Sequence, residues 1–150
     1  MYTGMMHLHS TLRYVLLILL IVTIYKAYTG YKQGRAFAAG DDKLSLYTMI
    51  VTHLQLLIGL YMYFASPTVQ NALTDMKTAM ADKVLRFLAV EHILGMLIGI
   101  ALITVGRIAS KKKSTGTQKF KTIWLYYGLG LLVIFLSIPW PFRDLGYGWF

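Results

Sequence analysis

Residues 86–107 read RFLAVEHILGMLIGIALITVGR, and this stretch decides the fold class of the chain. Between its two arginines it is almost wholly apolar, and it is long enough to cross a bilayer core, which needs about 20 helical residues. Inside it, Glu91 and His92 stand side by side. Ionisable residues are costly within a membrane and face the interior of a helix bundle. The stretch therefore predicts a membrane helix that carries a functional group.

Three further stretches have a similar apolar length, so we expect a single all-α domain, an integral membrane four-helix bundle. Only 14% of the 150 residues are charged, whereas soluble domains carry about 25%. The chain has no cysteine, which excludes disulfides, iron–sulfur clusters and thiolate metal ligands. The predicted spans are residues 10–28, 44–65, 84–106 and 123–138.

Basic residues are distributed unevenly between the two sides of the predicted bundle. The first and third connectors, with the adjoining helix ends, hold ten of the 15 lysines and arginines, and the other side holds five. Because basic loops stay in the cytoplasm, both termini are expected on the outer side of the membrane. The net charge of +9 is therefore read as a topology signal, and no nucleic-acid partner is expected.

The second connector, SPTVQNALTDMKTAMADK at residues 66–83, has a pattern of its own. Val69, Leu73, Met76 and Met80 recur at helical spacing between polar residues. The pattern predicts a short amphipathic helix on the outer membrane face. It serves either as a lid over a site between the helices or as a crossing between two helix tops.

All four histidines fall in or beside the first three predicted spans: His7, His9, His53 and His92. Counted from the basic end at about 1.5 Å per residue, His92 lies about 22 Å along its helix, His9 about 30 Å and His53 about 13 Å. Arg13 and Glu91 both lie at about 24 Å on the same count. Their helices are therefore expected to bring these charged residues and His92 to one level in the outer half.

Three interpretations fit this outer cluster. In the first, His92 and a second histidine bind the iron of a haem. The second ligand is His9, with His53 as the alternative, and Arg13 pairs with a haem propionate. In the second, Arg13 and Glu91 form a structural ion pair between the first and third helices. In the third, Glu91 or His53 takes a proton at a quinol site.

Gly95 and Gly99 follow His92 at one and two turns and leave a groove without side chains on the same helix face. A porphyrin plane fits against such a groove, which makes both glycines candidate cofactor contacts. The two glycines also form a GxxxG motif, which is typical of close helix packing in membranes. The sequence leaves both interpretations open.

Three segments carry a resemblance to a known group of proteins: LHSTLRY at residues 8–14, HLQLLIGLYMYF at 53–64 and VEHILGMLIGIALITVGR at 90–107. They resemble small bacterial four-helix membrane b-type cytochromes of cytochrome b561-like architecture. The resemblance implies haem b held by two histidines, and electron transfer with a quinone or a partner redox protein. Such proteins commonly take a ligand from the fourth helix too, but the fourth span here has no histidine. One haem is therefore expected in place of two.

The leading hypothesis is thus a haem-binding electron carrier of a respiratory chain, which transforms no substrate itself. The alternative is a cofactor-free accessory or interaction subunit of a larger membrane complex. In that case the Arg13–Glu91 pair and the GxxxG motif are packing devices. Either protein is compatible with a homodimer in the lipid bilayer.

Overall fold

The computed structural model describes residues 2–149 and shows helices and connectors, with no strand, over that range. Four helical runs are long and apolar enough to cross a membrane: α1 (Tyr2–Gln33), α2 (Ala39–Ala65), the run Lys83–Lys111, and α7 (Gly116–Ser137). The third run consists of α5 (Lys83–Arg86), the π-helix η1 (Phe87–Glu91) and α6 (His92–Lys111). The remaining elements are α3 (Pro67–Thr74), α4 (Met76–Ala81) and the 3-10 turn η2 (Pro141–Arg143). The all-α prediction is confirmed.

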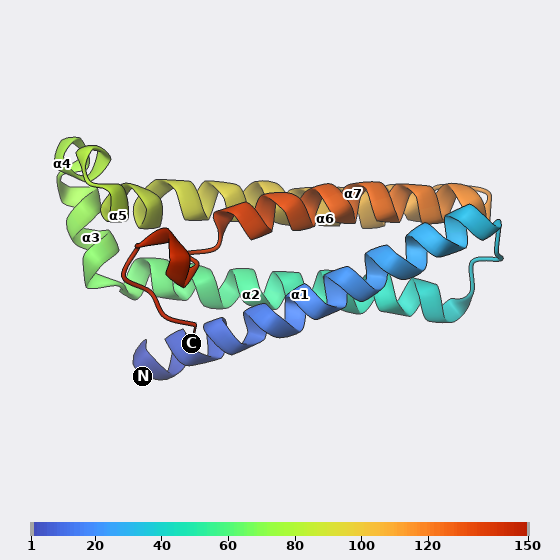
Figure 1. Ribbon diagram of the computed structural model, residues 1–150, viewed down its shortest axis with the longest axis horizontal. Coiled ribbons are helices and arrows are strands. Elements are labelled where there is room, and N and C mark those ends of the chain that lie inside the picture. Colours follow the sequence, from blue (N-terminus) through green and yellow to red (C-terminus); the bar gives the residue numbers. More distant parts are fainter. Residues whose placement is uncertain (1, 150) are drawn as a thin grey trace.

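The long helices run up and down along one bundle (Figure 1). Both chain ends lie with α3 and α4 at one end of the bundle, which we call the terminal end. The connectors at residues 34–38 and 112–115 lie at the opposite end, which we call the loop end. Helix α7 packs against both α6 and α1, and α1 packs against α2. The two termini and the α3–α4 segment are therefore on the same side, as the sequence predicts.

The helices extend beyond the predicted spans: α1 begins at Tyr2, and both α1 and α2 continue into the first basic connector. Helix α1 continues to Gln33 and ends in a Schellman motif: the Arg35 N–H donates to the Gly30 carbonyl at 3.1 Å. Gly34 supplies the required positive φ of 59°. At the start of α7, the Thr115 hydroxyl accepts from the backbone N–H of Gln118 at 3.2 Å.

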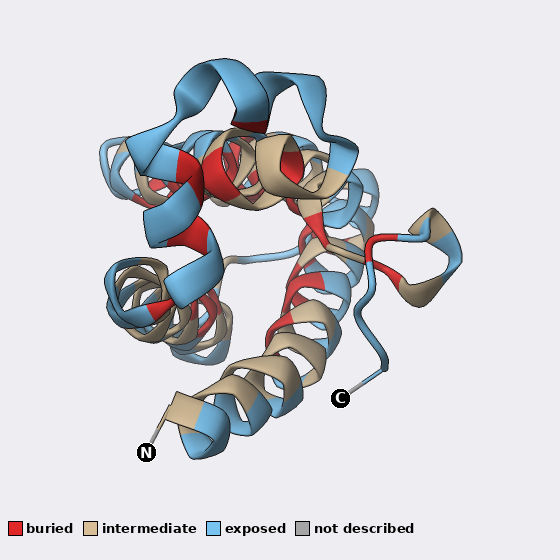
Figure 2. Ribbon diagram, turned by 90° about the vertical axis from the view of Figure 1, so that its left-hand side faces the viewer, coloured by how far each residue is buried: buried red, intermediate tan, exposed pale blue. Residues whose placement is uncertain are grey.

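The connector at the terminal end differs from its prediction, because it forms two short helices instead of one. Asp75 separates α3 from α4 with φ −136° and ψ 79°, and its carboxylate accepts from the Thr78 N–H as an N-cap. Val69 is buried, whereas Met76 and Met80 remain 40% and 46% exposed. Figure 2 shows this segment lying across the terminal end with mostly exposed residues.

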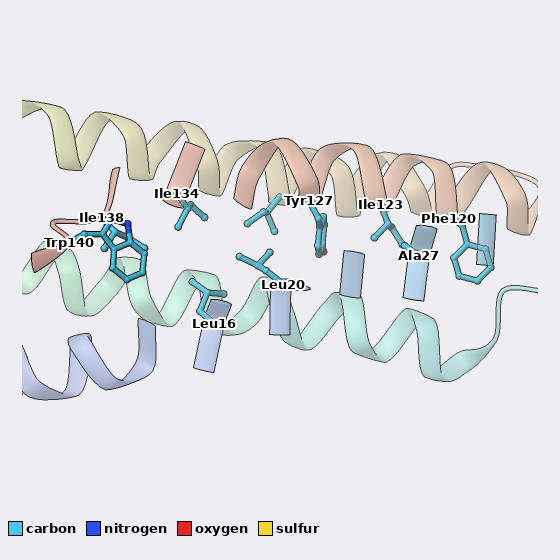
Figure 3. Close-up of a cluster of buried hydrophobic side chains, with 10 residues drawn as sticks. Leu16, Leu20, Ala27, Phe120, Ile123, Tyr127, Ile134, Ile138 and Trp140 are labelled. Atoms are coloured by element: carbon cyan, nitrogen blue, oxygen red, sulfur yellow. The ribbon is translucent and has the colours of Figure 1, made fainter. Parts of the chain in front are cut away.

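The apolar core lies between α1, α6 and α7 (Figure 3). Its buried members are Leu16, Leu20, Ala27, Ile103, Phe120, Ile123, Tyr127, Ile134, Ile138 and Trp140. Toward the loop end, Arg107 forms a bidentate ion pair with Asp42, with N–O distances of 2.7 and 3.1 Å. The Tyr127 hydroxyl donates to the Ser45 carbonyl at 2.7 Å. These two polar contacts join α2 to α6 and to α7.

Candidate functional site

A cavity of about 550 Å³ lies in the terminal-end half of the bundle. Small-molecule and cofactor sites typically occupy about 300–1,000 Å³. Residues from the middle of the helices line its inner part with apolar side chains, including Leu16, Met96 and Ile134. Its outer part is more polar, with Tyr2 and Tyr147 among the lining residues. The cavity therefore suits a molecule that is apolar at one end and polar at the other.

His92 reaches this cavity from the first turn of α6, directly after the π-helix η1. The backbone N–H of His92 donates to the Phe87 carbonyl five residues earlier, which defines the wide turn. Such single π-turns occur frequently at functional sites. Phe87 is only 2% exposed, and its ring centroid lies 6.0 Å from that of His92. The π-turn and this ring together set the position of the imidazole.

The end of α7 supplies a hydrogen-bond acceptor for His92. Ile138 precedes Pro139, and a residue before proline is driven out of the α-region, so α7 ends at Ser137. In a longer helix the Ser137 carbonyl would accept from residue 141, but Pro141 has no N–H. This carbonyl lies 2.7 Å from His92 Nδ1. Because a carbonyl only accepts, Nδ1 carries the proton and Nε2 keeps a free lone pair.

His9 lines the same cavity from α1. A Cβ atom at Gly59 of α2 would lie only 3.1 Å from His9 Cε1, so the glycine lets the imidazole approach the α2 backbone. Gln55, one turn before Gly59, also lines the cavity, and its Nε2 donates to the His9 carbonyl at 2.8 Å. These two α2 residues are absent from the sequence-based site. Gln55 and Gly59 are four residues apart and therefore share one face of α2, and this spacing was the sequence signal that could have placed them at the site.

Arg13 also lines the cavity, one turn after His9. Its Nη2 donates to the Trp149 carbonyl at 2.6 Å and to the Tyr14 hydroxyl at 3.1 Å. Its Nε is buried and has no hydrogen-bond partner. The guanidinium therefore ties α1 to the C-terminal segment at the edge of the cavity.

Glu91 is not part of this arrangement. Its carboxylate pairs with Arg86 at 2.7 Å on the exposed side of the helix. Within residues 2–149 no ion pair joins it to Arg13, which corrects that expectation. Successive helix residues point about 100° apart, so the turn that directs His92 into the cavity directs Glu91 away from it.

His53 lies outside the cavity lining. Its Nδ1 is 2.8 Å from the Met49 carbonyl, and its Nε2 is 3.3 Å from the Thr104 hydroxyl. Both ring nitrogens thus have partners inside the bundle. His7 is exposed. Of the four histidines, the structure brings His9 and His92 together at the cavity.

Gly95 and Gly99 face α7. A Cβ atom at Gly95 would collide with the Ser137 side chain, and one at Gly99 would lie 2.6 Å from Ile134 Cγ1. The groove that these glycines form is therefore filled by a helix. Of the two interpretations that the sequence left open, helix packing describes both positions.

The cavity offers two imidazoles and one guanidinium from different helices. Among residues 2–149, no group of three or more His, Asp or Glu side chains is placed to hold a bare metal ion. Two imidazoles are enough for a metal that brings its own planar ligand. No protein-family model, characterised protein or solved structure matches this chain. The assignment of a function therefore rests on the geometry of the cavity.

Proposed function

We propose that this protein is a membrane b-type cytochrome that carries electrons through one haem b. The observation that carries the proposal is the pair His9 and His92 at one cavity, with His92 Nε2 left free by the bond from Nδ1 to the Ser137 carbonyl. In metal-binding histidines, a carbonyl partner on the second nitrogen typically fixes the ring and raises its basicity. His92 has this partner.

Buried polar atoms without partners support the presence of a bound group. Four such side-chain atoms occur among residues 2–149, and three of them belong to cavity-lining residues: His9 Nδ1, Arg13 Nε and Gln55 Oε1. The fourth is Trp124 Nε1, away from the cavity. Native proteins leave few buried polar groups unsatisfied, so their concentration at one cavity favours a ligand there.

The residues of the cavity fit a haem in both shape and charge. The apolar inner part would suit the porphyrin, and His92 and His9 would hold the iron through their ring nitrogens. Arg13 lines the same cavity and would pair with a propionate, because guanidinium pairs well with carboxylate. A bound haem accepts and releases one electron at its iron. The apolar walls exclude water and hold the two imidazoles neutral, as metal ligation requires.

The proposed site of action is a bacterial cytoplasmic membrane, with both termini on the periplasmic side. The basic connectors at the loop end support this orientation. Electrons would be exchanged with a quinone or a redox protein at the terminal end, where the cavity lies. The protein functions in this proposal as a monomer, a homodimer or a subunit of a larger complex.

Cysteine labelling tests the orientation, and the native chain contributes no cysteine to the background. Single cysteines replace Asn71, at the terminal end, and Ser114, at the loop end. In intact spheroplasts a membrane-impermeant maleimide is expected to label N71C at once and S114C only after permeabilisation. Labelling of both from one side would overturn the four-span topology.

The absorption spectrum of the purified protein tests the haem itself. We expect a Soret band, and sharp α and β bands after reduction with dithionite. The same spectrum should develop at one haem per chain when the protein is titrated with hemin. A colourless preparation that leaves the hemin spectrum unchanged would contradict the proposal and favour the cofactor-free subunit.

A further inference from the structure

The two imidazoles at the cavity are held in different ways. His92 is fixed by the bond from Nδ1 to the Ser137 carbonyl, at 2.7 Å. It begins α6 directly after a π-turn and lies beside the buried ring of Phe87. Its backbone and its ring are therefore both constrained.

His9 has no comparable bond. Its Nδ1 is buried without a partner. The hydrogen bond from Gln55 goes to the backbone carbonyl of His9, so it positions the helix and leaves the ring free to turn. The tight approach of the ring is to Gly59, where an added Cβ would lie 3.1 Å from Cε1. The ring is thus positioned by packing alone.

The part of α1 that carries His9 is also loosely packed. The first buried residue of α1 is Leu16, so residues 2–15 include no buried side chain. Figure 2 shows this part of the helix with only intermediate and exposed residues. By contrast, η1 buries Phe87 and Ala89 immediately before His92. A small movement of His9 therefore disrupts few other contacts.

We infer that His9 is the displaceable one of the two ligands, and that the cavity takes a small neutral ligand, such as carbon monoxide or free imidazole, in its place. This inference rests on the proposed haem site. In the exchange, the bond from His9 to the iron breaks and a bond from the incoming ligand forms. His9 leaves as a neutral imidazole, so no electron or proton is gained or lost.

The hydrogen bond from His92 to the Ser137 carbonyl sets the expected difference in metal affinity between His92 and His9. Removing the partner that orients a metal-bound histidine typically lowers metal affinity by about 10–100-fold. His92 has such a partner and His9 lacks one. His9 is therefore expected to hold the metal about 10–100-fold more weakly than His92.

A carbon monoxide titration of the haem-loaded, dithionite-reduced protein in lipid nanodiscs tests the inference. The wild-type protein is expected to bind carbon monoxide, seen as a shift of the Soret band. Gly59→Ala places a methyl group against the His9 ring and should raise the affinity for carbon monoxide about tenfold. Gly128→Ala is the matched control, because a Cβ there meets no atom within 4 Å, and it should behave as wild type.

Imidazole rescue gives a second, independent measurement. His9→Gly is expected to keep its haem and to regain a six-coordinate spectrum with free imidazole, whereas His92→Gly should lose the haem. Absence of carbon monoxide binding in wild type, equal affinities in the two alanine variants, or the reverse rescue pattern would each overturn the inference. Failure of the haem proposal itself is distinct, because it appears as a missing Soret band before any ligand is added.

Discussion

The two halves of the bundle are built from the same helices but are packed in opposite ways. In the loop-end half α2 packs closely against its neighbours, and its Ser45 and Thr48 have no exposed surface. In the terminal-end half the helices enclose about 550 Å³.

The comparison shows a division of tasks along the bundle. In the loop-end half, Arg107 pairs with Asp42 and the Tyr127 hydroxyl pairs with the Ser45 carbonyl across the helices. In the terminal-end half, polar atoms at the cavity remain without partners. The first half can therefore hold the fold together while the second keeps its side chains available for a ligand. Substitutions in the loop-end half should therefore lower the stability of the fold, whereas substitutions in the terminal-end half should weaken haem binding.

The largest expected effect on stability comes from Asp42→Asn in the loop-end half. It leaves Arg107, whose side chain is 6% exposed, without its charge partner. Breaking a buried pair costs about 3–5 kcal/mol, and we expect about 3 kcal/mol because Asp42 is itself partly exposed. Equilibrium unfolding in mixed micelles measures the loss. The folded fraction should still bind one haem per chain.

Glu91→Gln is the matched control for Asp42→Asn, because the Glu91–Arg86 pair is exposed on both sides. Exposed ion pairs contribute less than about 1 kcal/mol. Equal destabilisation by the two substitutions would contradict the assignment of the fold-stabilising role to the loop-end half.

A smaller loss is expected for Gly106→Ala. The added methyl group overlaps the Cβ of Tyr126, an atom that is fixed to the backbone and cannot move without the helix. Overpacking of this kind costs about 1–3 kcal/mol. Gly128→Ala meets no atom within 4 Å and should leave the free energy of unfolding unchanged or slightly higher. An unchanged free energy of unfolding in Gly106→Ala would show that α6 and α7 are packed less closely at this position than described.

The smallest effect on stability is expected for Pro139→Ala in the terminal-end half, where haem affinity should change instead. Without the proline, Ile138 can adopt helical angles, and the Ser137 carbonyl can turn away from His92. We expect about tenfold weaker haem binding, measured by hemin titration. Pro67→Ala, in the first turn of α3, is the control and should bind haem as wild type does. Unchanged haem affinity in Pro139→Ala would contradict the proposal that the Ser137 carbonyl orients His92.

Most of the fold follows from the sequence. Apolar length alone predicts four spanning helices, and the basic connectors predict which helix ends share a side. The helix limits were less predictable, because lysine-rich connectors extend helices as readily as they end them. The break at Asp75 was also missed, since an aspartate can cap a new helix or lie within an old one.

The sequence predicted which helices contribute residues to the site, but it did not predict which side of each helix faces the cavity. His9, His92 and Arg13 do line one cavity, as their depths suggest. Glu91 points elsewhere because neighbouring helix residues point about 100° apart, and the sequence does not show which of the two faces the cavity. Gln55 was missed because its role depends on how α2 is rotated against α1.

The most direct test compares haem content and spin state in three purified variants, His92→Ala, His9→Ala and His53→Ala. We predict that His92→Ala binds no haem, that His9→Ala binds it in a high-spin, five-coordinate form, and that His53→Ala has the wild-type low-spin spectrum. Loss of haem or of the low-spin form in His53→Ala, with a wild-type spectrum in His9→Ala, would contradict the placement of the haem between His9 and His92.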